Sequence, residues 1–223
     1  MAIHHFGQQA SAEAVADLCR AAGPRAHVLM GNFAVDPGLA ATAVHDAVAG
    51  LGRIDILVNN AAVTTKREPF ETHSRALFEE IMTVNVTAPF LATQAAAGYM
   101  IRQGSGGRII NLGSVHGRMS APQRTAYEVS KGAIHALTFS TAVALGQHGI
   151  TVNCVAPGAI SVEHNAGVFD LAWYISRTPV GRMGTPDDIA SLIVYLASAE
   201  AGFISGETIY ADGAMMRRMP LVK

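Results

Sequence analysis

The sequence predicts an α/β fold in which a doubly wound parallel sheet carries helices on both faces. Short apolar runs rich in β-branched residues alternate with longer amphipathic stretches, as in strands joined by helical crossovers. Half of the 223 residues are hydrophobic, so the chain can bury a substantial core. No internal repeat, low-complexity segment or linker divides it, and we expect one domain over residues 1–223.

The first half of the chain contains three expected strands and two expected helices. Ser11 precedes an amphipathic stretch and is expected to cap it. A β-rich apolar run ends at the polar pair Asn59-Asn60. In chain order, we expect a strand over 2–6, a helix over 11–22, a strand over 27–30, a helix over 39–51 and a strand over 54–58.

The second half continues the same alternation. Thr185-Pro186 is expected to open a helix, because Thr is a good N-cap and Pro is tolerated in the first turn. Pro157-Gly158 is expected to end a strand. The expected elements are a long helical stretch over 74–103, a strand around 109–110 that ends near 114, a helix over 125–147, a strand over 151–155, a helix from 185 and a strand over 208–210.

Composition limits the kinds of partner that we expect. The chain has 16 Lys and Arg against 17 Asp and Glu, with no basic stripe for nucleic acid and no polybasic segment for a membrane surface. It has no long apolar span and no signal peptide, so a cytoplasmic protein is the default expectation. Cys19 and Cys154 are expected to be free thiols. His4 and His5 point to opposite faces of a strand, and we expect no metal site.

One pair of residues suggests acid–base chemistry. Tyr127 and Lys131 lie one helical turn apart, so their Cβ atoms are roughly 5–6 Å apart on the same helix face. An ammonium beside a phenol favours the phenolate and lowers the phenol's pKa. Such a pair can donate and accept the proton in alcohol–ketone chemistry. The alternative interpretation of a lone Tyr-x-x-x-Lys is a solvated helix face.

The polar strand ends fall at one edge of the predicted sheet. Ligands of open α/β sheets bind outside the carboxyl ends of the strands. Asn59-Asn60, Ser114 and Pro157-Gly158 all stand at such ends, and Tyr127 begins the helix that follows the Ser114 strand. The spacing therefore predicts that these groups share one site.

Further motifs accompany these residues in a fixed order. They are Asn59-Asn60-Ala61-Ala62, Asn85, Asn111-Leu112-Gly113-Ser114, Tyr127 with Lys131, Pro157-Gly158-Ala159-Ile160, residues 181–190, Gly206 and Asp212-Gly213. Together they resemble the short-chain dehydrogenase/reductase family from about residue 2 to residue 213, which implies a Rossmann-like sheet. Ala62 and Ala214 replace glycines of the family pattern.

The resemblance implies hydride transfer between a nicotinamide cofactor and the carbon of a secondary alcohol or ketone. Tyr127 would give its proton to the substrate oxygen in reduction, and Ser114 would hydrogen-bond that oxygen. Lys131 would lower the pKa of Tyr127 and bind the nicotinamide ribose. Asn85 would anchor a water that links Lys131 to solvent.

The same resemblance implies a set of cofactor contacts. Asn32 stands where the family usually has an Asp that contacts the adenine. Residues 4–9 include no acid to bind a ribose 2′-hydroxyl, which favours NADP over NAD. The implied cofactor residues are Asn32, Phe33, Asn60, Ala61, Ala62, Tyr127, Lys131, Pro157, Gly158, Ile160 and Ser161.

The implied substrate is a small-molecule alcohol or ketone. Residues 163–178 would cover it as an apolar lid, although a plain amphipathic helix explains their pattern equally well. Candidate substrates are 3-oxoacyl thioesters, sugars and diols. The family also uses helices equivalent to 74–103 and 125–147 for subunit contacts, so a homodimer or homotetramer is expected.

The largest departure from the family lies at the start of the chain. Residues 1–7 resemble the family's second strand, and the first strand and Gly-rich turn, on the order of 30 residues, are missing. The cluster Gly104-Ser105-Gly106-Gly107 precedes a strand, so it is a turn and not a phosphate loop. We therefore expect an N-terminally truncated sheet.

The truncation leaves two functions open. The chain is either an active oxidoreductase or a catalytically inactive relative that serves as a binding or assembly partner. A start codon internal to a longer gene would explain why the later motifs are intact.

Overall fold

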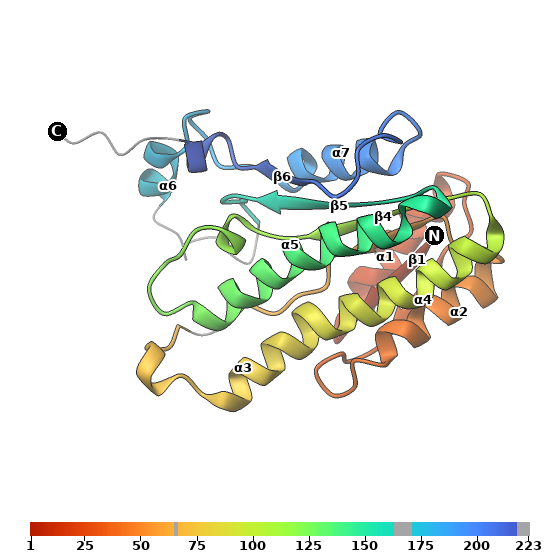
Figure 1. Cartoon of the computed structure of the whole chain (residues 1–223), viewed down its shortest axis with the longest axis horizontal. Helices are drawn as coiled ribbons and strands as arrows, with labels where there is room; N and C mark the ends of the chain where they lie inside the picture. Colours follow the sequence, from red (N-terminus) through yellow and green to blue (C-terminus); the bar gives the residue numbers. More distant parts are fainter. Residues whose placement is uncertain (65–66, 163–170, 218–223) are drawn as a thin grey trace.

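The computed structural model describes residues 1–64, 67–162 and 171–217, and it has the expected alternation of strands and helices (Figure 1). The strands are β1 (Ala2–His5), β2 (His27–Met30), β3 (Ile56–Asn59), β4 (Gly107–Leu112), β5 (Ile150–Pro157) and β6 (Thr208–Ala211). The helices are α1 (Gln9–Ala21), α2 (Leu39–Leu51), α3 (Arg75–Met82), α4 (Ala88–Gln103), α5 (Thr125–Leu145), α6 (Leu171–Arg177) and α7 (Pro186–Ala197).

All pairs of neighbouring strands are parallel, but they form two sheets instead of one. β1 pairs with β2 in a two-stranded sheet, and β3, β4, β5 and β6 follow one another in a four-stranded sheet. The register aligns Val58 of β3 with Ile110 of β4, and Ile110 with Asn153 of β5. Among the described residues, no strand pairs with both β1 and β3.

Helices cover both faces of the larger sheet, as a doubly wound fold requires. Ile109 and Val152 belong to a buried cluster with α2, α4 and α5. Ile110 and Val155 belong to a second cluster with α7. Because neighbouring side chains of a strand alternate between faces, the two clusters lie on opposite sides of the sheet.

Several expected boundaries are wrong, each for a local reason. α1 begins at Gln9 without a side-chain cap, so Ser11 lies inside the helix and is not its N-cap. Gln103 donates to the Ile54 carbonyl at 2.8 Å and accepts from the Ile54 N–H at 3.0 Å, so residue 54 is bonded to α4 and precedes the strand. The stretch over 74–103 is helical but contains a π-helical turn at Thr83–Thr87. α5 ends at Leu145, where a short 3₁₀ turn follows.

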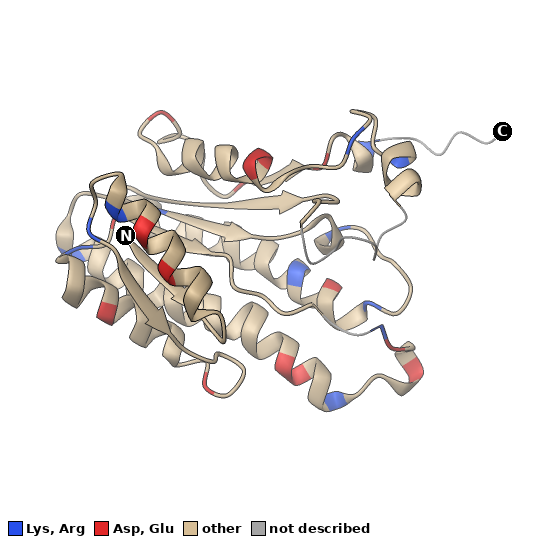
Figure 2. Ribbon diagram, turned by 180° about the vertical axis from the view of Figure 1, so that it is seen from behind, with Lys and Arg blue, Asp and Glu red and all other residues tan. Residues whose placement is uncertain are grey.

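The described part of the chain carries charged side chains of both signs (Figure 2). Figure 2 shows Lys and Arg interspersed with Asp and Glu along the described part of the chain. Among the described residues, no helix is long and apolar enough to cross a bilayer. Cys19 and Cys154 are both free thiols, as expected.

The start of α7 provides a test of one predicted cap. Thr185 accepts the Asp188 N–H at 3.3 Å, and Asp188 accepts the Thr185 N–H at 2.7 Å, forming a reciprocal capping box. We expect Thr185→Ala to lower the free energy of unfolding by about 1 kcal/mol and the Tm by roughly 2–4 °C. Urea and thermal unfolding measure both effects. Thr185→Ser keeps the hydroxyl and is the matched control, and equal losses in the two variants would contradict the capping role.

Candidate active site

The candidate site lies at the carboxyl edge of the four-stranded sheet, beside the start of α5 (Figure 1). Ser114 comes two residues after β4, and Gly113 continues the pairing by donating to the Val155 carbonyl at 2.8 Å. A Cβ added at Gly113 would lie 2.6 Å from Cys154 Sγ, so glycine lets the end of β4 approach β5 closely. Asn60 follows β3, and Pro157 ends β5, on either side of β4.

Ser114 and Tyr127 form the centre of the site. The Ser114 side chain is buried, accepts the His116 N–H at 3.1 Å and lies near enough to the Tyr127 hydroxyl to act on its pKa. Burial raises the pKa of Tyr127 above its usual range, and the Ser114 side chain and the charge of Arg124 only partly oppose this effect. The phenol of this cofactor-free chain is therefore protonated at neutral pH.

Lys131 is 4% exposed and packs beneath Tyr127. Its ammonium donates to the Leu112 carbonyl at 2.8 Å and lies 5.7 Å from the centroid of the Tyr127 ring. Burial lowers the pKa of Lys131 to about 8. Burial has the largest effect on the phenol, and the expectation that Lys131 lowers the pKa of Tyr127 stays a prediction.

Asn85 connects the π-helical turn to the start of α5. It is 2% exposed, accepts the Val63 N–H at 2.8 Å and donates to the Val63 carbonyl at 3.0 Å. It also donates to Ser130 Oγ at 3.1 Å, and Ser130 donates to the Tyr127 carbonyl at 2.7 Å. π-helical turns often mark functional sites, and this one fixes the loop after β3 to the helix that carries Tyr127.

A buried polar ladder lies behind the site. Asn59 donates to Asn111 Oδ1 at 2.8 Å and to Thr93 Oγ1 at 3.0 Å. Asn111 donates to Thr138 Oγ1 at 2.9 Å, and Thr138 donates to the Ile134 carbonyl at 2.8 Å. These bonds tie β3 and β4 to α4 and α5 across the core. The satisfied network specifies one register of strands and helices.

His116 and Glu128 form a polar rim beside Tyr127. The His116 ring lies edge-on to the Tyr127 ring with centroids 5.9 Å apart, and its Nδ1 is 3.2 Å from Glu128 Oε1. Glu128 also accepts the Ala121 N–H at 2.6 Å, which fixes the loop before α5. Burial lowers the pKa of His116, and the hydrogen bond to Glu128 partly opposes this effect.

The expected cofactor residues fall into two groups. Asn60, Ala61 and Ala62 are exposed and follow β3, where small side chains let a ligand approach the backbone. The segment after β5 is fixed by bonds from Gly158 to Ala211 at 3.0 Å and from Ser161 to Gly184 at 2.9 Å. Ile160 forms an isolated bridge with Gly184. These residues, with Tyr127 and Lys131, fit the nicotinamide half of a dinucleotide.

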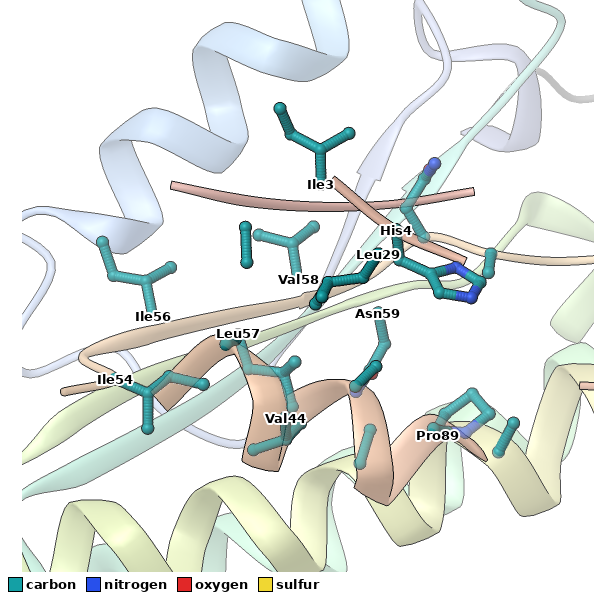
Figure 3. Close-up of a pocket in the computed structure, with 18 of the residues that line it drawn as sticks. Ile3, His4, Leu29, Val44, Ile54, Ile56, Leu57, Val58, Asn59 and Pro89 are labelled. Atoms are coloured by element: carbon teal, nitrogen blue, oxygen red, sulfur yellow. The ribbon is translucent and has the colours of Figure 1, made fainter. Parts of the chain in front are cut away.

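Asn32 and Phe33 belong to the other sheet. They follow β2, and Asn32 Oδ1 accepts the Ala34 N–H at 3.0 Å, as in an Asx turn. Phe33 stacks on His4 with ring centroids 4.1 Å apart. Asn32 and Phe33 thus lie beside the two-stranded sheet, apart from Tyr127 and Lys131, and Phe33 lines the same cavity as Asn60 and Ala61 (Figure 3).

Part of the expected substrate lid lies outside the described residues, namely 163–170. The rest forms α6, where Leu171 and Trp173 are exposed. Within the described ranges, no group of three or more His, Cys, Asp or Glu side chains is arranged to hold a metal ion.

The sequence interpretation missed two supporting residues. Ser130 lies inside the Tyr-x-x-x-Lys segment, one turn after Tyr127, so its spacing could have marked it as a link. His135 packs against Gly113 and Gly117, where an added Cβ would approach its ring, and its Nε2 is buried without a partner among the described residues. No sequence pattern marks His135.

Comparison with known proteins agrees with this geometry. The family model described as enoyl-(acyl carrier protein) reductase matches residues 1–215. L-rhamnose 1-dehydrogenase (NAD(P)(+)) of Sphingomonas sp. (strain SKA58) is 36% identical over 224 residues, covering 96% of this chain and 85% of the relative.

Solved structures give the same result. Acetoin dehydrogenase from Enterobacter cloacae has a TM-score of 0.91 and 35% identity, covering 100% of this chain and 87% of that one. A gluconate 5-dehydrogenase from Burkholderia cenocepacia J2315, in complex with NADP and tartrate, has a TM-score of 0.87 and 32% identity, covering 98% and 86%. The chain belongs to the short-chain dehydrogenase/reductase family and is an NAD(P)-dependent oxidoreductase.

The buried Lys131 predicts an unusual dependence of stability on pH. Its pKa falls from the ordinary value of 10.5 to about 8 on folding, so the unfolded chain binds the proton more tightly. The contribution of Lys131 to stability is least favourable below pH 8 and improves as pH rises from about 8 to 10.5. Relative to Lys131→Met, we expect the native chain to gain up to about 3 kcal/mol across that window. Urea denaturation of both proteins at pH 7, 8, 9 and 10 measures the difference, and parallel curves would contradict it.

Proposed function

We propose that this chain interconverts a secondary alcohol and a ketone, with Tyr127 as the proton donor and acceptor. The proposal is supported most directly by the proximity of the buried Ser114 side chain to Tyr127, whose pKa it lowers, at the carboxyl edge of the sheet, with the buried Lys131 ammonium 5.7 Å from the centroid of the Tyr127 ring. Ser114 follows β4, and Tyr127 and Lys131 lie on α5.

The nicotinamide of the cofactor, when bound, supplies or accepts the hydride. In ketone reduction, Ser114 donates a hydrogen bond to the substrate oxygen and Tyr127 delivers its proton to that oxygen. Donors that are fixed before the charge develops stabilise the transition state most effectively. The raised pKa of Tyr127 keeps the phenol protonated at neutral pH, which is the form that proton donation requires.

Lys131 holds its ammonium at the Leu112 carbonyl, close enough to the Tyr127 ring to stabilise a phenolate after proton transfer. Asn85 and Ser130 hold the loop after β3 against α5. We further propose that Asn85 anchors a water that returns a proton to this centre. Asn60, Ala61, Ala62, Pro157, Gly158, Ile160 and Ser161 hold the nicotinamide half of the cofactor in this proposal.

NADP is the preferred cofactor in this proposal. The end of β1 and the turn after it, residues 4–9, contain no Asp or Glu that could accept a hydrogen bond from a ribose 2′-hydroxyl. In this proposal the cofactor spans the two sheets, and Asn32 and Phe33 contact its adenine half.

A small polar alcohol or ketone is the proposed substrate. The rim beside Tyr127 is polar, since His116 and Glu128 are paired there and the charge of Arg124 acts on both His116 and Tyr127. The similar proteins named above are a rhamnose, an acetoin and a gluconate dehydrogenase. A hydroxylated substrate such as a sugar or diol therefore agrees with the rim better than a long acyl thioester. A cytoplasmic location is also proposed, since the charge of the chain is balanced and includes no polybasic segment for a membrane surface.

The alternative, a catalytically inactive assembly partner, is not favoured. Its basis is the missing strand, whereas Ser114, Tyr127 and Lys131 are all present and in contact. The named relatives are dehydrogenases.

The proposed acid–base role predicts a separation of binding from turnover. We expect NADPH fluorescence to increase on binding, and Tyr127→Phe to bind NADPH as well as the native chain while losing at least ~10²–10⁴-fold in kcat. Titration with NADPH and NADH, followed by ketone-dependent NADPH oxidation, measures both. Tyr99→Phe is the control, because the Tyr99 hydroxyl bonds His45 on α2, away from the site. Retained turnover in Tyr127→Phe would exclude Tyr127 as the acid, and a folded chain that binds neither cofactor would exclude the proposed function.

A homodimer or homotetramer is also proposed. Phe139 and Val143 lie four residues apart on one face of α5 and are 57% and 85% exposed, and Phe90 of α4 is also exposed. An apolar face of this kind on two long helices is typical of a subunit contact. We expect Val143→Asp to shift the chain toward a smaller species in light scattering. Val35→Asp, at an 80% exposed position after β2, is the control, and a native monomer would contradict the proposal.

A further inference from the structure

The loop that carries Ser114 packs on one side chain of α5, that of His135. A Cβ added at Gly113 would lie 2.8 Å from His135 Nε2, and a Cβ added at Gly117 would lie 2.3 Å from its Cε1 and 2.8 Å from its Nε2. Gly113 and Gly117 stand on either side of Ser114, just after β4 and in the short turn that follows. The His135 ring therefore contacts the loop at two points that flank Ser114.

Space is the reason for glycine at both of these points. Neither Gly113 nor Gly117 has a φ in the left-handed region, so the backbone conformation alone would allow alanine at either position. At Gly117 the three atoms nearest to an added Cβ all belong to the His135 ring. At Gly113 the nearest atom is Cys154 Sγ, at 2.6 Å, and His135 comes second. Gly117 is thus matched to the His135 ring alone.

The ring of His135 is enclosed on further sides. It meets the Tyr210 ring of β6 edge-on, with centroids 6.1 Å apart and an interplanar angle of 89°. Its Nε2 is buried and has no hydrogen-bond partner among the described residues. Burial and the charge of Lys131 lower the pKa of His135, and the Ser114 backbone opposes this effect, so the ring is neutral at neutral pH. A neutral ring packed in this way has little room to move aside.

His135 also shares a helix face with two residues of the candidate site. Tyr127, Lys131 and His135 follow one another at intervals of four residues along α5, so they form one row on the helix. Lys131 donates to the Leu112 carbonyl at 2.8 Å, one residue before Gly113. The row therefore contacts the end of β4 through Lys131 and the following loop through His135.

We propose that His135 is a positioning residue for Ser114: its ring, packed against the glycines on either side, holds the Ser114 hydroxyl where the substrate oxygen binds. The hydroxyl accepts the His116 N–H at 3.1 Å, and the Gly117 N–H donates to the Ser114 carbonyl at 3.0 Å. Both bonds require the course of the loop that the ring supports. The effect on turnover rests on the proposed function, whereas the packing of the ring against the loop does not.

The position of this loop is sensitive to a single methyl group. An added methyl at Gly117 must displace the ring or the loop, because 2.3 Å is far below the ~3.5–4.0 Å of an ordinary carbon–carbon contact. A hydrogen-bond donor stabilises a developing negative charge only when it is already in place as the charge appears. A displacement of about 1 Å can lower turnover by ~10²-fold.

Alanine variants test the contact. Gly117→Ala displaces the ring or the loop, His135→Ala removes the ring, and a double variant combines the two changes. Gly132→Ala is the matched control, since the nearest atom to an added Cβ there is the Gly117 carbonyl oxygen at 3.7 Å, an ordinary contact. The control therefore adds the same methyl group between α5 and the same loop without a clash.

Amide hydrogen exchange gives a readout that needs no turnover. The reporter is the His116 amide, which bonds the hydroxyl in question. We expect Gly117→Ala and His135→Ala to speed exchange at His116 by about tenfold or more. Exchange at Arg108, whose N–H is bonded at the other end of β4, should stay native, and Gly132→Ala should match the native chain at both amides.

Ketone-dependent oxidation of NADPH gives the functional readout. We expect kcat to fall at least ~10-fold in Gly117→Ala and in His135→Ala, with the KM for NADPH within about twofold of native. The two losses should not multiply: the double variant should turn over as fast as His135→Ala, because removal of the ring makes room for the methyl group. A purely structural role would instead lower the Tm and leave kcat per folded molecule unchanged.

Three results would overturn the proposal. One is native exchange at His116 together with native kcat in Gly117→Ala, and another is a double variant in which the two losses multiply. The third is faster exchange at Arg108 as well as at His116, which would show a general loosening of the fold. If the native chain turns over no ketone while exchange at His116 responds as expected, the proposed function fails and the positioning of Ser114 stands.

Discussion

The parallel pairing of β4 with β5 is the constraint on which the site depends. β5 is buried along nearly its whole length, and its pairing with β4 runs from Gly107 to Leu112 and continues at Gly113. Ser114 emerges where this pairing ends, and α5, which packs on β5, delivers Tyr127 and Lys131 to the same point. The polar ladder through Asn111 then fixes the rotation of α5 against the sheet. A shift of one residue in this register would turn Asn111 out of the core, so strand register and catalytic geometry are specified together.

The electrostatics of the centre follow from burial more than from the pairing of charges. Both Tyr127 and Lys131 are shielded from water, and burial penalises the charged form of each. The Tyr127 phenol therefore keeps its proton at neutral pH, whereas the Lys131 ammonium, with a pKa of about 8, loses its proton more readily than an exposed lysine. A centre of this kind is poised to give a proton to an oxygen that becomes negative. Among the described residues, the ammonium donates to the Leu112 carbonyl at 2.8 Å.

Local chemistry predicted much of this fold and part of the site. The bounds of β2 and α2 agree with expectation, and α2 stops where Gly52 takes a left-handed conformation with φ of 91°. The Thr185 cap is confirmed by the capping box at the start of α7. The Ser11 cap failed because the helix extends past it to Gln9. The π-helical turn at Asn85 and the direction of the Tyr127 pKa could not be predicted, since both depend on packing from distant segments.

The break in the sheet divides the candidate site along the line where a dinucleotide would lie. The nicotinamide half belongs to the four-stranded sheet, and Asn32 and Phe33 belong to the two-stranded one. The two sheets are joined through α2, whose Ala40 and Val44 pack with Ala92 and Ala96 of α4. Small residues allow these helices to approach closely, but they bury little area per residue. Among the described residues, β1 and β3 share no ladder hydrogen bonds, and α2 contacts both the smaller sheet and α4. A cofactor that binds as proposed above would bridge both halves, so its affinity would depend on how firmly α2 holds the smaller sheet.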